Sequence, residues 1–428
     1  MQRRIFLLAP AAMAARPARA QAPTTLRFLW WGGSDRHART LKAIAAFEAR
    51  HPGVRVKAEY MGFNGYLEKL TMQMASGTEA DVLQINWAWL AMFSRQGTGF
   101  LDLQQQAGAI ALDQFSAADL DSCRVNGRLN GLPVSYTARL FLWNQSTFQR
   151  AGLALPRSWD ELFAAGPAFK ARLGEGFYPL DGEPYDMLLL AHAHVMQQHG
   201  TPYVHPTEPR VAMSAAALLD WVQTYRRLGD TGTCTPVPYR ASLGGVDKPT
   251  EQQQDWVAGR WAGNFTWDSA FRLRASTLAK GQQLALGEYL TLPGAQTSGL
   301  FARPTLLFSV SRHTRQPELA ARFLDFMTTD VDAARILGTT RALPSAARAR
   351  DALEREGQVP PLELAAQRQI RQLREAGRVQ VPSPRFEDAR LRRLMREVFE
   401  RISYRKLTDQ EAARRLLDEG NALLSRMT

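Results

Sequence analysis

Alternating strand and helix patterns near the start of the chain restrict its fold more than any other feature. Three apolar or β-branched stretches predict strands, at residues 25–31, 54–60 and 81–86. Between them, residues 38–53 and 66–76 carry apolar side chains at helical spacing, and a proline-glycine pair ends the first helix. Strand, helix, strand, helix, strand at these lengths predicts a parallel sheet in an α/β domain. Ligands of such sheets bind beyond the carboxyl ends of the strands.

The loops that follow these three strands carry an unusual set of aromatic, amide and charged side chains. Aromatic faces cover the apolar face of a pyranose ring, while amides and charged groups bind its hydroxyls, so the mixture favours a carbohydrate ligand. Burial in the core is the alternative for each tryptophan, and for Trp30 it fits equally well. The candidates from these loops are Trp31, Asp35, Arg36, Asn64, Trp87 and Trp89.

The totals are those of a globular chain with more than one domain. Its 428 residues exceed one ordinary core, and 45% apolar against 22% charged residues excludes general disorder. The formal net charge of +12 falls by four to +8 without the arginines of residues 1–20. That charge allows nucleic acid, an anionic surface or an acidic small ligand. We expect no nucleic acid, because the basic residues are dispersed and do not alternate with aromatics.

Neither the cysteines nor the histidines form a metal-binding pattern. Cys123 and Cys234 stand 111 positions apart without a CxxC pair, and we expect two buried free thiols rather than a disulfide. Four histidines between residues 192 and 205 lack the i, i+4 spacing that places two imidazoles on one helix face. We therefore expect no metal and no cofactor.

Residues 1–20 have the features of a secretory signal: an early basic pair, a short apolar run and an Ala-Arg-Ala cleavage pattern. Residues 3–7, RRIFL, resemble the twin-arginine consensus, and an ordinary positively charged signal start fits them equally. No other segment approaches 18 uninterrupted apolar residues. We expect export to the periplasm without a lipid anchor.

Residues 130–163 are expected to join two halves of the chain. A glycine-leucine-proline opening leads into a long β-branched and aromatic stretch that predicts a strand, with Tyr136 and Arg139 within it. A short helix follows, and Ser158 with Glu161 three positions later forms a capping box for the next helix. One long strand and two helices suit a connection between domains.

The same stretch, GLPVSYTARLFLWNQSTFQRAGLALPRSWDELF, resembles the corresponding part of family 1 extracellular solute-binding proteins, the sugar receptors of bacterial ABC importers. The resemblance continues through DVLQINWAWLAMFSRQGTGFLDL, DWVAGRWAGNFTWDSAF, the return segment from residue 298 to residue 330, LGTTRALPS and the closing helix after Thr408. Each motif is loose, but their order and spacing cover nearly all of the mature chain.

This resemblance implies a two-lobed, maltose-binding-like α/β fold of type II, with hinge crossings between the lobes. Lobe 1 would comprise residues 21–135 and 299–340, and lobe 2 residues 136–298 and 341–428. It also implies a monomer that closes on an oligosaccharide and delivers it to an ABC permease. The motifs add the candidate ligand-binding residues Trp267, Asp268, Arg303 and Arg341.

The segments WWGGSDRHART, GTGFLDL and FARPTLLFS resemble the oligogalacturonide-binding branch of the family, and the positive charge suits a uronate ligand. Arg36, Arg139 and Arg303 are then candidates for carboxylate contacts, because a guanidinium group binds a carboxylate through two hydrogen bonds. The bland alternative is that these arginines lie on the surface or between the lobes.

A secreted polysaccharide lyase or glycosidase is the competing class, since it would also have a signal and an aromatic cleft. A glycosidase needs two carboxylates ~5–10 Å apart across one bond, and the sequence pairs none. GxSxG, HExxH and P-loop motifs are absent from it. A receptor for iron or a polyamine is disfavoured by the lack of paired tyrosines and by the basic charge.

Overall fold

The computed structural model describes residues 23–427, so the predicted signal at residues 1–20 lies outside the described part. Seven strands form one sheet in the order β2-β1-β3-β9-β6-β7, with β8 beside β6. Their bounds are β1 Thr24–Trp31, β2 Val54–Met61, β3 Val82–Asn86, β6 Leu132–Asn144, β7 Gly263–Trp267, β8 Leu284–Leu286 and β9 Ala302–Val310. A two-stranded hairpin contains β4 Arg124–Val125 and β5 Arg128–Leu129.

The first lobe is built on the predicted parallel strands. β1 pairs in parallel with β2 and β3, whereas β3 pairs antiparallel with β9, which returns from far along the chain. Its apolar core draws on residues 26–132 and 306–359. Its helices are α1 Ser34–Arg50, α2 Tyr66–Ser76, α3 Leu90–Phe93, α4 Ala117–Ser122, α12 Pro317–Thr329, α13 Val331–Leu337 and α14 Ala347–Arg355, with short 3-10 turns η1 Trp87–Trp89, η2 Leu103–Gln106 and η3 Leu112–Gln114.

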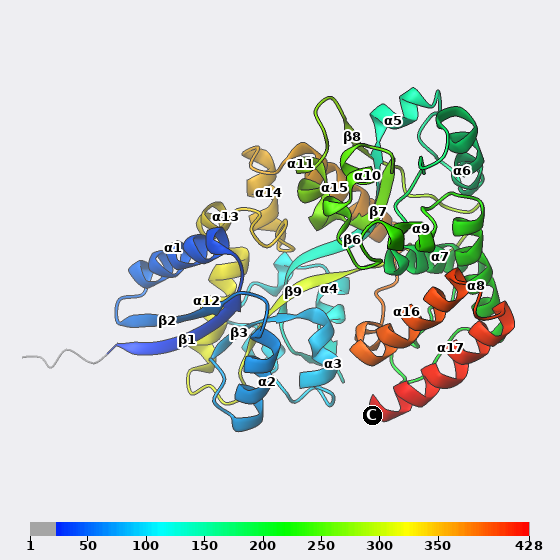
Figure 1. Cartoon of the computed structure of the whole chain (residues 1–428). Helices are drawn as coiled ribbons and strands as arrows, with labels where there is room; N and C mark the ends of the chain where they lie inside the picture. Colours follow the sequence, from blue (N-terminus) through cyan, green and yellow to red (C-terminus); the bar gives the residue numbers. More distant parts are fainter. Residues whose placement is uncertain (1–22, 428) are drawn as a thin grey trace, which may run out of the picture.

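Two long strands, β6 and β9, cross between the lobes. The first half of β6 pairs with β9, and its second half pairs with β7 and β8 in the second lobe. Figure 1 shows β6 and β9 running side by side through the middle of the molecule. A register shift on both sides of Ser135 interrupts the pairing close to the crossing. The predicted connection at residues 130–163 is thus a crossing strand followed by α5 Gln145–Arg150 and α6 Trp159–Leu173.

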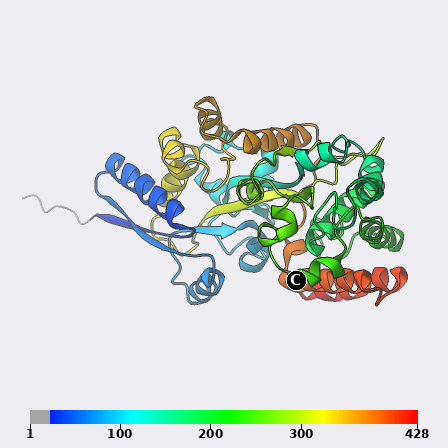
Figure 2. The same ribbon diagram turned by 45° about the horizontal axis from the view of Figure 1, so that its top comes forward.

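The second lobe is mainly helical. Its core includes α7, of which 14 of 16 residues are buried, so this helix forms the centre of the lobe. Figures 1 and 2 both show α16 and α17 lying side by side on its outer side. The remaining elements are α7 Pro184–His199, α8 Ala215–Asp230, α9 Val237–Ser242, α10 Gln254–Val257, α11 Phe271–Ser276, α16 Ala389–Ser403 and α17 Asp409–Leu424, with η4 Thr250–Gln252, η5 Asp268–Ala270, η6 Pro384–Glu387 and η7 Ser425–Met427.

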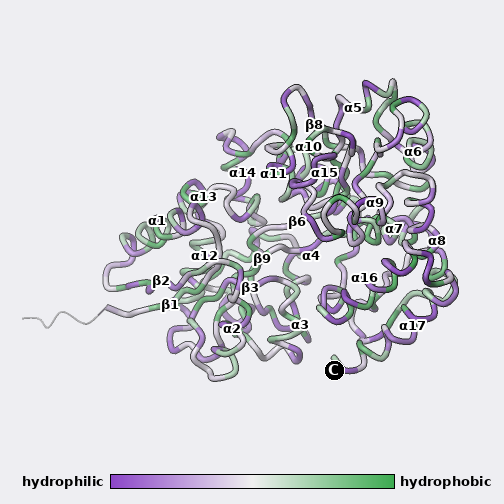
Figure 3. Tube along the Cα trace, viewed as in Figure 1, coloured by the Kyte–Doolittle hydropathy of each residue, from purple (hydrophilic) through white to green (hydrophobic). Residues whose placement is uncertain are grey.

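A third, small apolar cluster lies at the crossing itself, where α15 (Pro361–Glu375) packs on β6. The chain leaves the first lobe later than residue 341, because residues 343–359 pack in the first core. The sequence pattern of α14 shows an apolar face without showing which lobe covers it. Figure 3 shows hydrophobic and hydrophilic residues alternating along the outer helix α16, as its one-sided burial requires.

Several local predictions are confirmed. Ser158 caps α6 as predicted, but the box with Glu161 is not closed, because the Glu161 carboxylate accepts from the backbone nitrogen of Arg157 at 2.7 Å. The closing helix expected after Thr408 is α17, and Thr408 and Glu411 form a reciprocal capping box at its start. Cys123 and Cys234 are buried free thiols in the cores of different lobes. Within residues 23–427, no helix combines the length and apolar character needed to cross a bilayer.

Candidate ligand-binding cleft

A cavity of about 730 Å³ lies between the lobes where the two crossing strands meet. Trp31, Arg36 and Asn86 line it from the first lobe, and α11 lines it from the second. Trp31 and Asn86 end β1 and β3, so this is the carboxyl edge of the parallel strands, as predicted. We call this cavity the first compartment. The rest of its lining is Phe63, Asp268, Ser269, Thr305, Leu306, Thr339, Thr340, Arg341, Ala342, Leu343, Glu363 and Gln367.

Arg341 is the most unusual group in the first compartment. The residue is 5% exposed, and its Nε donates to Oε1 of Gln84 at 2.7 Å. Its two terminal nitrogens have no hydrogen-bond partner within residues 23–427. Burial lowers the pKa of Arg341, and the neighbouring charge of Arg36 lowers it further. A buried guanidinium with unpaired nitrogens is costly, and a ligand carboxylate would satisfy both nitrogens at once.

Arg36 stands beside Arg341 in the first turn of α1. Its Nε and Nη2 donate to the carbonyl of Thr340 at 3.0 and 2.7 Å, and its Nη1 donates to the carbonyl of Trp31 at 3.2 Å. These bonds hold the guanidinium against the crossing segment. Because α1 begins at Ser34, earlier than the predicted residue 38, Asp35 is part of the helix and points about 100° away from Arg36 around its axis.

That earlier start removes Asp35 from the site. Its side chain is 72% exposed and pairs with Arg39 one turn along α1, at 3.0 Å. It contributes to neither compartment of the cleft. The prediction treated residues 32–37 as a loop, because Gly33 caps α1 without a side-chain hydrogen bond and gives no sequence signal.

A second cavity of about 500 Å³ continues the cleft on the other side of Phe63 and Asn86, which line both. We call it the second compartment. Trp89 forms its wall in the first lobe, and Arg303 lies opposite on β9. Arg303 forms an ion pair of 2.7 Å with Glu387 of η6, so a protein carboxylate already occupies this guanidinium. The remaining lining is Leu67, Ala88, Ala91, Met92, Arg95, Pro384, Asp388, Ala389, Arg390, Arg392 and Met427.

Three aromatic rings join the two compartments along the first lobe. The centres of Trp31 and Trp89 are 5.3 Å apart, and Phe63 lies 5.7 Å from Trp31 and 6.3 Å from Trp89. Phe63 is 55% exposed, so a ring face is open to the cleft. The prediction selected Asn64 from this loop, but Asn64 is exposed and lines neither compartment.

Trp267 does not offer the open stacking surface that the sequence suggested. The guanidinium groups of Arg139 and Arg303 each lie over its ring, 4.8 Å from the centre. Arg139 is itself buried and ion-paired with Asp186. Neither Trp267 nor Arg139 lines a compartment of the cleft. Arg139 and Arg303, which were proposed as ligand contacts, instead cover the ring of Trp267. This packing holds Arg303 at the floor of the second compartment.

Three further residues predicted to bind the ligand have other surroundings in the structure. Trp87 is 1% exposed in the first core, and its Nε1 donates to the carbonyl of Ser122 at 2.7 Å. Tyr136 faces a separate cavity behind the cleft. Asp268 borders the first compartment, but its carboxylate accepts hydrogen bonds from Thr137 Oγ1, Ala138 N and Gln367 Nε2. Asp268 thus ties β6 to α15, and η5 begins at Asp268 itself, so the residue at its cap position is Trp267.

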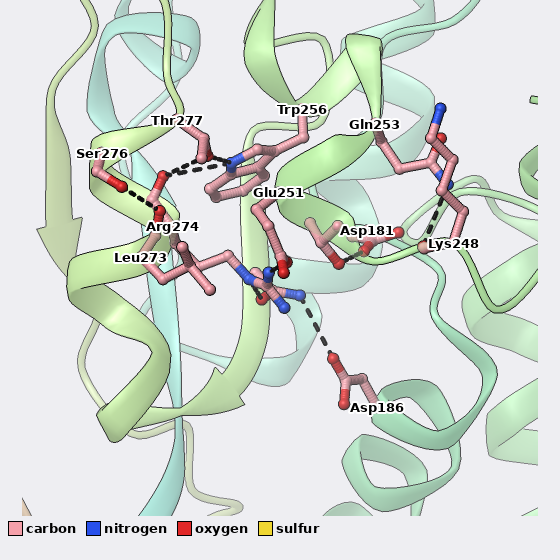
Figure 4. Close-up of polar contacts among 12 residues, drawn as sticks. Asp181, Asp186, Lys248, Glu251, Gln253, Trp256, Leu273, Arg274, Ser276 and Thr277 are labelled. Atoms are coloured by element: carbon pink, nitrogen blue, oxygen red, sulfur yellow. Dashed lines mark hydrogen bonds and ion pairs between the residues drawn. The ribbon is translucent and has the colours of Figure 1, made fainter. Parts of the chain in front are cut away.

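The second-lobe wall of the first compartment is α11, which is held in place by contacts inside that lobe. Arg272, Leu273 and Ser276 of α11 face the cavity, while Arg274 points into the lobe. Figure 4 shows Arg274 and Glu251 pointing toward each other, and they form an ion pair. Trp256 Nε1 adds a hydrogen bond to Thr277 Oγ1 at 3.2 Å. No sequence signal marked Arg272, Glu363 or Gln367 as cleft residues, and Asn86 was expected only as the last residue of the strand 81–86.

Glu183 makes the stability of the second lobe depend on pH. Its side chain caps α7 through the Asp186 amide at 2.8 Å, and burial, with the nearby Asp186 charge, raises its pKa to about 7. Between about pH 4.5 and 7 the folded protein holds a proton that the unfolded chain has released, so stability falls as pH rises through this window. We expect Glu183→Gln to raise the melting temperature at pH 8, because the variant has no buried carboxylate to ionise. The rise should be ~2–4 °C for each kcal/mol of unfolding free energy gained. At pH 4.5 we expect the melting temperature to be unchanged. Thermal denaturation of both proteins at the two pH values checks this. A difference in melting temperature between variant and wild type that is the same at both pH values contradicts the assignment.

Two α/β lobes joined by long crossing strands around a polar and aromatic cleft define a two-lobed solute-binding protein. The sequence matches the bacterial extracellular solute-binding protein family over residues 34–204. Together with the full-length similarities below, this shows that the chain belongs to that family.

The solved structures similar to this chain include a periplasmic oligogalacturonide-binding protein from Yersinia enterocolitica in complex with saturated digalacturonic acid. It is 35% identical, covers 94% of this chain and 99% of its own, and has a TM-score of 0.81. A periplasmic solute-binding protein from Pectobacterium atrosepticum is 34% identical, with the same coverage and a TM-score of 0.85. A putative binding protein of Brucella abortus is 27% identical over 197 residues, which are 45% of this chain and only 46% of that relative.

Proposed function

We propose that this chain is the periplasmic receptor of an ABC importer and that it captures a uronate-containing oligosaccharide by closing its lobes. The observation that carries the proposal is Arg341, whose two terminal nitrogens are buried and unpaired at the wall of the first compartment. A sugar carboxylate is the ligand group that fits a guanidinium fork in such a place. The similarity to an oligogalacturonide-binding protein supports the same ligand class.

The remaining lining suits a sugar chain that bears this carboxylate. Thr305 Oγ1 is a second buried polar atom without a partner within residues 23–427, and it borders the same compartment. Phe63 and Trp89 offer ring faces along one side, and the buried Trp31 packs behind them at 5.7 and 5.3 Å. Stacking at ~1 kcal/mol per ring and charged hydrogen bonds at ~1.5–3 kcal/mol each, less ordering costs, are enough for a dissociation constant of ~1 μM.

Lobe closure follows from the position of the ligand. The compartments are lined by both lobes and by the strands that join them, so a ligand touching both sides stabilises the closed arrangement. We propose that the closed, loaded form is what the permease recognises, and that the receptor acts as a monomer.

We also propose that the protein binds its ligand without altering it. A glycosidase needs two available carboxyl groups facing one bond. The two that line the first compartment are Asp268, which accepts three hydrogen bonds from the protein, and Glu363, which is paired with Arg272 at 2.8 Å. Both are already occupied.

Isothermal titration of the mature protein with digalacturonate, trigalacturonate and the neutral disaccharide galactobiose tests the proposal. We expect micromolar binding of the acidic sugars and at least ~30-fold weaker binding of galactobiose, because one lost charged interaction is worth ~2 kcal/mol. Chromatography of the same mixtures should return the sugars intact. Equal affinity for the neutral sugar contradicts the ligand class, and unsaturated or shortened products contradict the receptor.

A further inference from the structure

The second compartment is large enough to hold part of a ligand by itself. Its volume of about 500 Å³ and the 730 Å³ of the first compartment each fall within the range of a complete small-molecule site. Phe63 and Asn86 line both compartments, so one ligand can extend from the first into the second. A ligand that fills only the first compartment leaves the second to solvent.

The two sides of the second compartment differ in chemical character. The first-lobe side is mainly apolar and aromatic: Phe63 is 55% exposed and Met92 is 43% exposed, and Trp89 lines the same side. The second-lobe side is mainly charged and comes from residues 384–392, which form η6 and the start of α16. This pairing of surfaces matches a sugar ring, which has an apolar C–H face and polar substituents.

The charged groups of the second compartment carry a positive excess. Four arginines line it against two carboxylates, and each carboxylate is already paired with an arginine. The pairs are Arg303 with Glu387 and Arg390 with Asp388. Arg95 and Arg392 remain, and neither has a carboxylate partner within residues 23–427. The unpaired charge of this compartment therefore suits an anionic group.

Arg392 is held at the second-lobe side by an aromatic ring. Its guanidinium lies 4.5 Å from the centre of the Tyr185 ring, and the residue is half-buried on α16. The guanidinium of Arg139 lies 5.5 Å from the same ring, but Arg139 is paired with Asp186. Packing on a ring restricts an arginine without using its hydrogen-bond donors, so those of Arg392 stay available to an anion.

Arg95 faces the same compartment from the first lobe, just after α3. It is exposed, and like charges on opposite lobes oppose closure. A carboxylate bound in the compartment offsets this repulsion and accepts hydrogen bonds from both lobes. An anionic group at this place therefore stabilises the closed arrangement.

Given the uronate ligand proposed above, we propose that the second compartment binds a further uronate residue of the same chain. The receptor is then selective for oligouronides longer than the dimer. The bound sugar lies with its apolar face toward Trp89 and Met92, and its carboxylate accepts hydrogen bonds from Arg392 and Arg95. Arg392 makes the larger contribution to this selectivity, because its position is already restricted by the Tyr185 ring.

Calorimetric titration of the mature protein with digalacturonate and tetragalacturonate tests this selectivity. We expect at least ~10-fold higher affinity for the tetramer, because a hydrogen bond to a charged group is worth about this factor. The neutral sugars galactobiose and galactotetraose should differ by less than ~3-fold, since stacking of one more ring without a carboxylate contributes less.

Arginine variants show which side chain produces the preference. Arg392→Met should reduce the preference for tetragalacturonate over digalacturonate to less than ~2-fold, and Arg95→Met should reduce it to ~3-fold, because an exposed charge contributes less. Arg393→Met is the matched control, since Arg393 is the next residue on α16, is exposed and lies outside the lining. It should retain the preference of the wild type. The preference is a ratio measured on one folded protein, so a change in stability does not alter it.

Each outcome bears on the second compartment or on the ligand class. Equal affinity for the two acidic lengths in the wild type overturns the proposal and leaves the acidic ligand class intact. A preference that Arg392→Met retains in full does the same. A preference for galactotetraose as large as that for tetragalacturonate overturns the carboxylate contact. Failure of both acidic sugars to bind overturns the proposed function itself, and the length selectivity with it.

Discussion

Replacing Arg341 with methionine is expected to lower the affinity for digalacturonate by about 100-fold or more. The guanidinium has two buried terminal nitrogens without a hydrogen-bond partner among residues 23–427, and hydrogen bonds to charged groups contribute ~1.5–3 kcal/mol each. The loss of two such bonds exceeds the ~2.7 kcal/mol that corresponds to a 100-fold change. Arg341→Lys keeps the charge without the planar fork, so we expect an intermediate loss of ~10-fold.

Stability should move differently from affinity in this variant. Arg341 is buried with an unsatisfied charge in the free protein, so its removal relieves a desolvation cost while Gln84 loses one donor. We expect the melting temperature of free Arg341→Met to stay within ~2 °C of the wild type or to rise, since the ~1 kcal/mol terms nearly cancel. The ligand-induced rise in melting temperature should be largely lost.

A matched control is Arg322→Met, which makes the same change of charge on the exposed face of α12. Arg322 is 56% exposed and paired only with exposed Glu318 among its described charged neighbours. Digalacturonate affinity should then change less than two-fold. Calorimetric titration of the three proteins checks both results. Unchanged affinity in Arg341→Met would remove the central support for an acidic ligand.

The regular elements of this fold could be predicted because their signals are local. α2 begins and ends at the predicted residues, and the capping box of α17 is visible as a threonine followed three positions later by a glutamate. The lobed architecture followed from the order of motifs. The start of α1 could not be predicted, because Gly33 caps it without a side chain, and that error misplaced Asp35.

The site was harder to predict because its chemistry depends on partners distant in sequence. Trp267 follows a strand as a stacking residue would, but Arg139 and Arg303, from β6 and β9, lie over it. Arg303 looked free to bind a ligand, but Glu387 is paired with it from 84 positions away. Conversely, nothing in the sequence shows that Arg341 lacks partners for two of its nitrogens. Sequence identifies residue types near a cleft, whereas packing decides which of them keep unused hydrogen bonds.

The largest expected loss of stability comes from Asp181→Ala in the second lobe. Asp181 and Arg240 form a fully buried ion pair, with 0% exposure of both side chains and an Nε to Oδ1 distance of 2.9 Å. Removing the carboxylate leaves the Arg240 charge in the core, which costs ~3–5 kcal/mol. At ~2–4 °C per kcal/mol, the melting temperature should fall by ~10 °C. Urea denaturation followed by tryptophan fluorescence measures the same change as a free energy.

Two comparisons separate an unpaired buried charge from simple loss of contacts. Glu318→Ala breaks an exposed arginine pair and should cost less than ~0.5 kcal/mol. The double variant Asp181→Leu/Arg240→Met replaces both charges with apolar groups and should recover at least half of the lost stability, because no charge stays buried without a partner. A double variant no more stable than Asp181→Ala would show that the ion pair itself, rather than the stranded arginine, determines the loss.

The same variant also tests how the second lobe supports the cleft. Thr250 donates to Asp181, and Glu251, the next residue, pairs with Arg274 of α11. Because α11 forms the second-lobe wall of the first compartment, loosening this support should weaken digalacturonate binding in the folded fraction of Asp181→Ala. The effect should stay below ~10-fold, or ~1.4 kcal/mol, because no ligand contact is removed. A loss as large as that of Arg341→Met would mean that the wall, and not the guanidinium, provides most of the affinity.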